Sequence, residues 1–218
     1  MKKNYIVIGL GRFGINLVKE LIALKREVLA IDKNKETVEK VGQITPYCAV
    51  ADSSNIKALE DLDVRSIDHA IVAIGSNLQD TILTVLNLRQ LGVKNVTVRI
   101  ETEELKEVML KVGATEVIIP EVASAIGLAN QLLSDSIVDY YKVNSDFGMA
   151  TVVVGDDFKE QTVLQLDSRK KFDINIIGIR RGDNFFIPKP DDVILKQDML
   201  TVFGNDKKIV KFDSFLNK

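Results

Sequence analysis

The sequence predicts an α/β protein in which a doubly wound parallel sheet is followed by a smaller α+β lobe. Three observations lead to this prediction. Up to Pro120, short runs rich in β-branched residues alternate with stretches whose apolar residues recur at helical spacing. After Pro120 the alternation ends, and a long apolar stretch leads into several short β-like runs. A glycine-rich loop follows the first β-like run, in the place where such folds bind phosphate groups.

Each element of the first part follows from its residue pattern. The expected strands are almost uniformly apolar, as in a parallel sheet with helices on both faces. They are expected at Asn4–Gly9, Glu27–Asp32, Tyr47–Asp52, His69–Gly75, Asn95–Ile100 and Glu116–Pro120. Helices are expected at Phe13–Lys25, Asn34–Gly42, Ser53–Leu62, Asn77–Leu91 and Glu103–Val112. Repeated βαβ units of this kind build a parallel sheet.

The second part begins with Val122–Tyr141, which is expected to be mainly helical. This crossover would join a domain of residues 1–121 to a C-terminal lobe of residues 142–218. Its apolar positions are too many for one buried face, which favours packing on a second subunit; the alternative is a last helix on its own sheet. In the lobe, β-like runs are expected at Ala150–Gly155, Ile174–Arg180, Phe185–Pro188 and Met199–Gly204, and helical turns at Thr162–Asp167 and Asp191–Ile194.

Composition narrows the class of function. The 218 residues carry a formal net charge of −2, which provides no general attraction to nucleic acid or anionic lipid. Tryptophan is absent and aromatic residues make up 6%, poor material for a base-stacking platform. No apolar run approaches the length of a membrane span, and the single cysteine, Cys48, excludes an internal disulfide. We therefore expect a cytoplasmic protein that neither binds nucleic acid nor inserts into a membrane.

The loop from Gly9 to Gly14 has the spacing G-x-G-x-x-G between an expected strand and an expected helix. Gly9 permits the tight turn, Gly11 lets a diphosphate approach the backbone, and Gly14 lets the helix pack closely on the strand. Free N–H groups at the start of the helix favour a phosphate. The alternative is a loop whose glycines serve packing alone.

Charged residues beside the loop predict an adenine nucleotide. Asp32 ends the second strand, where a carboxylate can accept hydrogen bonds from both ribose hydroxyls. The same charge would repel a 2′-phosphate and disfavours NADP, although Lys33 beside it weakens that exclusion. Arg12, inside the loop, would direct a forked cation toward the more distant phosphates. The alternative for Arg12 is an ion pair with a surface acid.

Two further strand ends meet the same edge of the expected sheet. Asp52 and Ser53 follow the third strand, and Gly75-Ser76-Asn77 follows the fourth, near where a base or ribose would lie. Ser53 and Asn77 would also serve as helix caps, and capping is compatible with contact to a ligand.

Residues for redox catalysis are missing. An oxidoreductase needs a proton donor or acceptor beside the nicotinamide, and the single histidine, His69, is expected to be a strand-end residue. Cys48 stands in an apolar run and is expected in the core. No metal-ligand cluster is visible, and the C-terminal lobe is short for a substrate domain. These features favour a nucleotide-binding sensor with no catalytic residues; a small NAD-dependent oxidoreductase is the alternative.

Together these stretches resemble the RCK family of regulators of K+ conductance, and most closely the cytosolic subunits of bacterial Ktr/Trk-type potassium uptake systems. The matching stretches are VIGLGRFG, EVLAIDKN, DHAIVAIGSN, NVTVRIE, GATEVIIPE and, in the lobe, LQLDSRKKFDINIIGIRRG. The resemblance implies a Rossmann domain, a helical crossover and a C-terminal RCK lobe. It also implies homodimers assembled into an octameric ring beneath a membrane-embedded K+-translocating subunit. In similar proteins ATP activates and ADP inactivates.

The resemblance also implies a site for ATP or ADP, with NAD as a further candidate ligand. Arg12 would reach the distal phosphates, and Asp52 and Ser53 would lie near the adenine. Arg99 stands where such subunits often carry lysine, and Glu121 matches a glutamate beside the phosphates at the dimer interface, where Mg2+ or Na+ would bridge the two. The implied set is Gly9, Gly11, Arg12, Phe13, Gly14, Asp32, Lys33, Asp52, Ser53, Ile74, Gly75, Ser76, Asn77, Arg99 and Glu121, with Glu121 as the metal ligand.

In the lobe, the stretch LQLDSRKKFDINIIGI resembles lobes that bind cyclic di-AMP. This ligand is two-fold symmetric, and a symmetric dimer offers the same groups to each half. An arginine would pair with a phosphate, an amide with phosphate or base, and apolar residues would form a cleft for adenine. The implied residues are Leu164, Asp167, Arg169, Asn175, Ile176 and Pro188, with Pro190 as the alternative to Pro188. The other interpretation is that they form only the core and dimer seam of the lobe.

Overall fold

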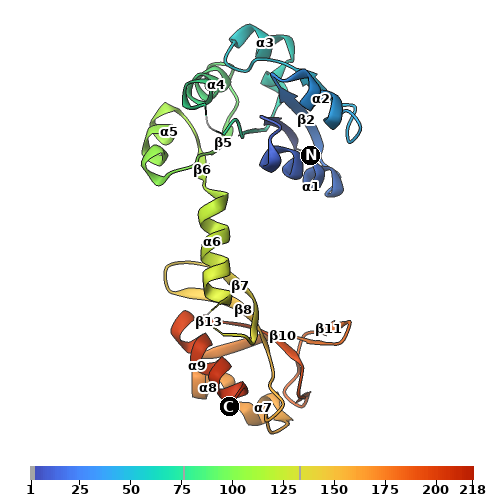
Figure 1. The fold of residues 1–218 in the computed structure, drawn as a ribbon, viewed down its shortest axis with the longest axis vertical. Helices are drawn as coiled ribbons and strands as arrows, with labels where there is room; N and C mark the ends of the chain where they lie inside the picture. The colour runs from blue at the N-terminus through green and yellow to red at the C-terminus, as the bar shows by residue number, and fades with distance from the viewer. Residues whose placement is uncertain (1–2, 76, 133) are drawn as a thin grey trace. The chain divides into compact units, whose positions relative to one another are not determined.

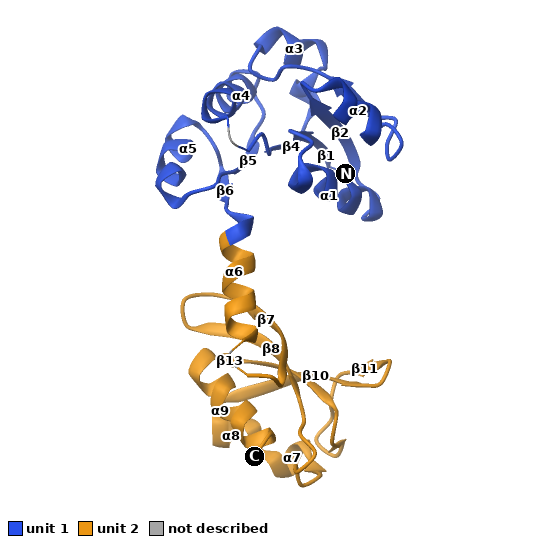
Figure 2. Ribbon diagram, viewed as in Figure 1, with its two compact units in different colours: residues 1–121 blue, residues 122–218 orange. Residues whose placement is uncertain are grey.

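The computed structural model describes residues 3–75, 77–132 and 134–218. The chain divides into two compact units, Met1–Glu121 and Val122–Lys218 (Figure 2). The first unit has a hydrophobic cluster on each face of its sheet, and the second has one cluster of its own.

The first unit is a parallel sheet with helices on both sides (Figure 1). In the described residues six strands lie in the order β3-β2-β1-β4-β5-β6, and every neighbouring pair is parallel. The strands are β1 (Asn4–Ile8), β2 (Glu27–Asp32), β3 (Cys48–Val50), β4 (His69–Val72), β5 (Asn95–Arg99) and β6 (Glu116–Ile118). The helices are α1 (Arg12–Ala23), α2 (Lys35–Val41), α3 (Ile56–Asp61), α4 (Leu78–Gln90) and α5 (Lys106–Val112), with 3₁₀ turns at Val64–Ser66 and Glu103–Leu105. This strand order confirms the predicted Rossmann-type fold.

Both faces of this sheet are buried. In β1, Ile6 and Ile8 belong to one hydrophobic cluster and Val7 to the other, because successive side chains of a strand point to opposite faces. Residues of α1 and α2 complete the cluster around Val7, and residues of α3, α4 and α5 complete the other. Cys48, expected in the core, is only half-buried, since it lies in β3 at the edge of the sheet.

The second unit is built on an antiparallel sheet (Figure 1). Its described residues form five strands in the order β11-β10-β13-β8-β7, and a separate ladder joins β9 to β12. The strands are β7 (Ile137–Lys142), β8 (Phe147–Val153), β9 (Gln161–Thr162), β10 (Ile174–Arg181), β11 (Asn184–Phe186), β12 (Val193–Ile194) and β13 (Met199–Asn205). The helices are α6 (Pro120–Gln131), α7 (Val163–Leu166), α8 (Ser168–Phe172) and α9 (Asp206–Leu216). The sequence analysis missed α8 and α9, although Ile209 and Phe212 of α9 are fully buried in the core.

The helix expected over Val122–Tyr141 is too long. α6 ends at Gln131, and Ile137–Lys142 forms β7, which pairs with β8. Hydroxyl groups of Ser134 and Ser136 hydrogen-bond in the turn between them, and the β-branched and aromatic residues that follow favour a strand. No residue of α6 is buried. Among the described helices, none is both long and apolar enough to cross a membrane.

The helical turn expected at Asp191–Ile194 is also wrong. The carboxylate of Asp192 accepts a hydrogen bond from the N–H of Lys189 and closes a turn. Val193 and Ile194 then form β12, paired with β9. Ile194 is fully buried in the core, so burial of a β-branched residue in an extended segment decides the local structure.

Candidate functional site

A cavity of about 570 Å³ opens at the carboxyl ends of the central strands of the first unit. Doubly wound sheets bind their ligands in this crevice, where the connections from neighbouring strands diverge. The implied residues that line it are Gly9, Gly11, Arg12, Phe13, Asp32, Lys33, Asp52, Ser53, Ile74, Gly75, Arg99 and Glu121. The sequence analysis missed Ile8, Leu10, Thr37, Ala51, Ala73 and Asp80, which also line it. Gly14 and Asn77 are not part of the lining, and Ser76 lies outside the described residues.

Two of the three loop glycines are required by the fold itself. Gly9 has φ +94, and a Cβ there would lie 2.7 Å from the carbonyl carbon of Ala73. A Cβ on Gly14 would lie 2.0 Å from the carbonyl oxygen of Gly9. Neither position can accept a side chain unless the backbone moves, because each neighbour is a backbone atom.

Gly11 differs from both. It has the ordinary extended φ of −70 and ψ of −170, and a Cβ there would meet no described atom within 4 Å. It is the N-cap of α1, where no side chain caps the helix and no acidic residue occupies the first turn. The first N–H groups of α1 therefore remain available, and the helix dipole adds partial positive charge at this point. The protein does not need glycine here, but an anion approaching the backbone would.

Asp32 is tied to the glycine loop. Its Oδ2 accepts a hydrogen bond from the N–H of Leu10 (2.7 Å), and its Oδ1 accepts one from the N–H of Asn34 (2.8 Å). A carboxylate has about four acceptor positions, so it can still bind ribose hydroxyls. The sequence analysis assigned Asp32 to the ligand alone; the structure adds a role in holding the loop.

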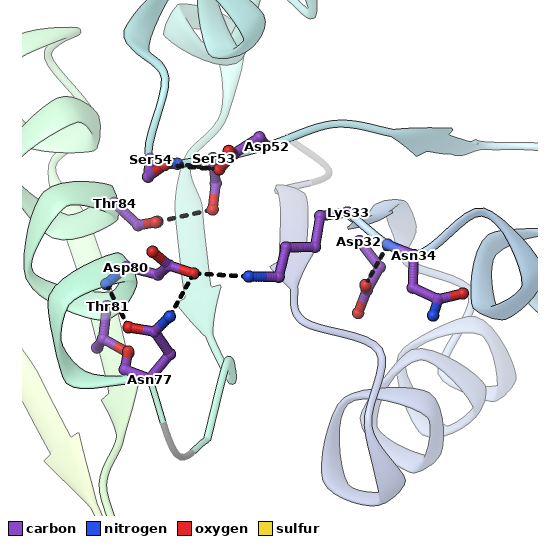
Figure 3. A network of polar contacts seen from close by, with 10 residues as sticks. All are labelled: Asp32, Lys33, Asn34, Asp52, Ser53, Ser54, Asn77, Asp80, Thr81 and Thr84. Atoms are coloured by element: carbon purple, nitrogen blue, oxygen red, sulfur yellow. Dashed lines mark hydrogen bonds and ion pairs between the residues drawn. The ribbon is translucent and has the colours of Figure 1, made fainter.

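An ion pair joins the β2–α2 loop to α4 (Figure 3). Nζ of Lys33 lies 2.8 Å from Oδ2 of Asp80, and both residues line the cavity. The hydrogen bond to Asp80 raises the pKa of Lys33. Asn77 caps α4 by accepting from the N–H of Asp80 (3.0 Å), which confirms the capping interpretation. An aspartate three residues after a cap is the sequence signal that could have revealed Asp80.

Ser53 has a structural contact and is not a helix cap. Its hydroxyl lies 2.7 Å from that of Thr84 in the interior (Figure 3), and Asn55 caps α3 instead. Neighbouring Asp52 accepts hydrogen bonds from the backbone N–H and the hydroxyl of Ser54, and the pKa of Asp52 is lowered by them.

The far side of the cavity carries a second ion pair. Nη2 of Arg99, at the end of β5, donates to Oε1 of Glu121 in the first turn of α6. The hydrogen bond from Arg99 lowers the pKa of Glu121. Arg12 is exposed and forms no ion pair within the described residues, so the surface pair considered as its alternative is not found.

His69 is remote from this chemistry. It begins β4, whereas the cavity is lined by residues beyond the other end of that strand. Its Nε2 lies 2.7 Å from Oγ1 of Thr97, and its ring stacks on Tyr5. Burial lowers the pKa of His69. Its contacts are those of a strand-end residue.

Within the described residues, no group of three or more His, Cys, Asp or Glu side chains is placed to hold a metal ion. Glu121 is a single carboxylate. A cation bound to it would need further oxygen ligands, which the phosphates of a bound nucleotide would provide.

A second cleft, of about 290 Å³, lies in the second unit. Asp167 joins α7 to α8 in a left-handed conformation with φ 50, which aspartate tolerates better than most residues. The cleft is lined by the implied Leu164, Asp167, Arg169, Ile176 and Pro188, together with Val163, Ser168 and Pro190. Asn175 is not part of the lining, because it precedes Ile176 on β10 and neighbouring strand side chains point to opposite faces.

Comparison with known proteins identifies the family. Residues 5–120 match the TrkA-N domain and residues 149–217 the TrkA-C domain. The Ktr system potassium uptake protein C of Bacillus subtilis is 36% identical over 214 residues, which cover 98% of this chain and 97% of that protein. The chain belongs to the Ktr potassium uptake protein family. This confirms the resemblance on which the residue assignments rest.

Solved structures share the fold of this Ktr family member. The RCK domain of GsuK has a TM-score of 0.67 at 13% identity and aligns with 100% of this chain, which spans 48% of that one. The NAD(P)-binding domain of an exopolyphosphatase-related protein from Archaeoglobus fulgidus is 28% identical with a TM-score of 0.54, covering 59% of this chain and 96% of that domain.

Proposed function

We propose that this protein is a regulatory subunit that binds ATP or ADP and sets the activity of a membrane-embedded K+-translocating subunit. Family membership supports the potassium uptake system. The main support for a nucleotide as the ligand is Gly11, whose missing side chain leaves open space in the cavity. With Asp32 beside the loop, this is the arrangement that binds a ribose and a diphosphate.

The strand order sets the direction of the nucleotide. Asp32 ends β2, the glycine loop follows β1, and Arg99 ends β5 beyond β4. A nucleotide with its ribose on Asp32 and its first phosphates on α1 therefore extends its distal end toward Arg99. Mg2+ or Na+ would bridge that end to Glu121, because two anions approach closely only with a cation between them.

Charge at the distal end favours a phosphate over a nicotinamide. Arg12 and Arg99 both line the cavity, and guanidinium groups pair with phosphate oxygens in a forked manner. A similar structure is an NAD(P)-binding domain, so NAD is the second ligand to test. If NAD is the ligand, the alternative function is an NAD-dependent oxidoreductase. The position of His69, far from the cavity, argues against that alternative.

Exposed apolar residues on α6 support a homodimer. Val122, Ile126 and Leu128 are exposed, and no residue of α6 is buried within its own chain. An apolar helix surface of this kind is stabilised by a second copy. Such dimers would assemble into an octameric ring at the cytoplasmic face of the membrane, beneath the K+-translocating partner.

Two measurements test the proposal. Thermal unfolding with ATP, ADP, NAD and NADH should show stabilisation by ATP and ADP of roughly 2.7 kcal/mol at 100 times Kd. K+ flux through vesicles that contain the purified partner should then rise with ATP and fall with ADP. Flux that responds to neither nucleotide would contradict the regulatory function, and hydride transfer from NADH would support the alternative.

Arg12→Ala should reduce activation of flux by ATP more than it changes the effect of ADP. The guanidinium reaches the phosphates beyond the first, and a regulator responds only to a ligand that binds its two states differently. The matched control is Arg26→Ala, an exposed arginine outside the cavity. If ATP activates the Arg12→Ala protein as it does the wild type, Arg12 does not contact the terminal phosphate in a way that affects activation.

We also propose a cyclic di-AMP site in the cleft of the second unit. Apolar Leu164, Ile176 and Pro188 line it beside Arg169, so an adenine-sized apolar surface adjoins a phosphate-binding cation. Two-fold symmetry of the dimer would present this set to each half of the ligand. Pro190 lines the cleft as well, whereas Asn175 is not among the lining residues.

Arg169→Ala should weaken cyclic di-AMP binding by roughly tenfold to a hundredfold, the loss of one charged hydrogen bond. Calorimetry on the full chain measures it. Lys170→Ala is the matched control, because Lys170 is the next residue of α8, is exposed and does not line the cleft. If both variants bind cyclic di-AMP equally well, Arg169 is not part of the site. If the wild type does not bind cyclic di-AMP, the proposed site does not exist.

A further inference from the structure

Charge is unevenly distributed along the lining of the cavity in the first unit. The carboxylates of Asp32, Asp52 and Asp80 line it, and the negative charge of each acts on Lys33, which lines it too. One ammonium group among three carboxylates gives this part of the cavity a formal charge of −2. The other charged side chains that the structure places in the lining have a formal charge of +1; they are Arg12, Arg99 and Glu121. The part around Lys33 therefore repels an anion unless Lys33 is free to bind it.

Lys33 stands where a cation could bind a phosphate on the ribose. It follows Asp32, the last residue of β2, and a cation near this carboxylate is what allows sites of this fold to accept the 2′-phosphate of NADP. The side chain of Lys33 is 62% exposed, so a ligand in the cavity can reach it. In the sequence, Lys33 therefore weakens the exclusion that the charge of Asp32 provides.

In the structure, Asp80 holds this cation. Its Oδ2 lies 2.8 Å from Nζ of Lys33 and accepts a second hydrogen bond, of 2.8 Å, from Nδ2 of Asn77 (Figure 3). The carboxylate is the fixed member of the ion pair, because its side chain is 21% exposed and belongs to the first turn of α4. A phosphate on the ribose would have to take Lys33 from Asp80. An ion pair with an exposed lysine is weak, but here it adds to the repulsion by the carboxylates.

We infer that this cavity excludes nucleotides that carry a phosphate on the ribose, and that Asp80 completes the exclusion by holding Lys33. The inference rests on the proposed function and narrows its ligand class to adenine nucleotides with free ribose hydroxyls. A ribose phosphate carries nearly two negative charges at neutral pH, and it would meet Asp32 while the charge of Lys33 is neutralised. NADP shares the adenosine and the diphosphate with ADP, so without this exclusion it would compete for the regulatory site.

The experiment measures the affinity of the full chain for ADP and for 2′-phospho-ADP by calorimetry. The two ligands differ only in the phosphate on the ribose, so the ratio of their affinities reports the exclusion. The wild type should bind 2′-phospho-ADP at least about tenfold more weakly than ADP, because like charges face each other. Asp80→Asn keeps the shape of the side chain but releases Lys33, so it should narrow this ratio by about threefold to fivefold.

A second substitution, Lys33→Met, separates release of the lysine from a general loss of negative charge. In the wild-type background it should change the ratio by less than about twofold, because Asp80 already holds the lysine. In the Asp80→Asn background it should abolish the gain, since residues in contact show non-additive effects. If Lys33→Met has the same effect in both backgrounds, charge alone accounts for the result and Asp80 does not act through Lys33.

Glu103→Gln is the matched control, because Glu103 is 62% exposed, forms a surface ion pair with Lys106 and does not line the cavity. Its ratio of affinities should equal that of the wild type. If the wild type binds ADP and 2′-phospho-ADP equally well, the inference is wrong and the proposed function still stands. If the wild type binds neither, the proposed function fails together with this inference.

Discussion

Gly11→Ala should leave the fold intact and weaken ATP and ADP binding by roughly tenfold to a hundredfold, because the new methyl group occupies ligand space. A Cβ at this position meets no described atom within 4 Å, and the backbone has φ −70. The free energy of unfolding should change by less than about 1 kcal/mol, because alanine has less conformational freedom in the unfolded chain but is a poorer N-cap than glycine.

Gly9→Ala is the matched comparison within the same loop. Its Cβ would lie 2.7 Å from a backbone carbon of Ala73, and its φ is +94. We expect a loss of about 2–4 kcal/mol in the free energy of unfolding. Denaturant unfolding and calorimetry on both variants separate the two roles. Normal nucleotide binding by Gly11→Ala would show that the ligand does not approach this part of the loop.

Asp32→Asn should weaken ATP binding by roughly tenfold to a hundredfold, since one charged hydrogen bond to ribose is worth about 1.5–3 kcal/mol. It should also lower the free energy of unfolding by about 1–3 kcal/mol. The amide keeps one acceptor, but the N–H groups of Leu10 and Asn34 each require one.

Calorimetry at a temperature where the variant is fully folded separates these two effects of Asp32→Asn. Asp61→Asn is the control, because Asp61 is exposed at the end of α3 and does not line the cavity. ATP affinity equal to that of the wild type in folded Asp32→Asn would contradict the ribose assignment. An unchanged free energy of unfolding would contradict the role of Asp32 in holding the loop.

The sequence by itself determined the parallel sheet and the position of its glycine loop. These features are local: a strand has period two, a helix has period 3.6, and a phosphate loop needs glycine at fixed spacing. Asp32 was found in the same way, because it ends the second strand of a recognisable βαβ unit. The local sequence pattern predicted a helix at Ile137–Lys142, and this prediction was wrong because the segment pairs with β8 as a strand.

Only the tertiary structure decided which charges meet and which glycines the fold requires. Lys33 and Asp80 are 47 positions apart, and Arg99 and Glu121 are 22 apart. Gly9 and Gly11 look equivalent in the sequence, but Gly9 lies against the backbone of Ala73, directly after β4, and Gly11 faces open space. The physical reason is that ion pairs and steric contacts depend on the order in which strands assemble, and no local periodicity records that order.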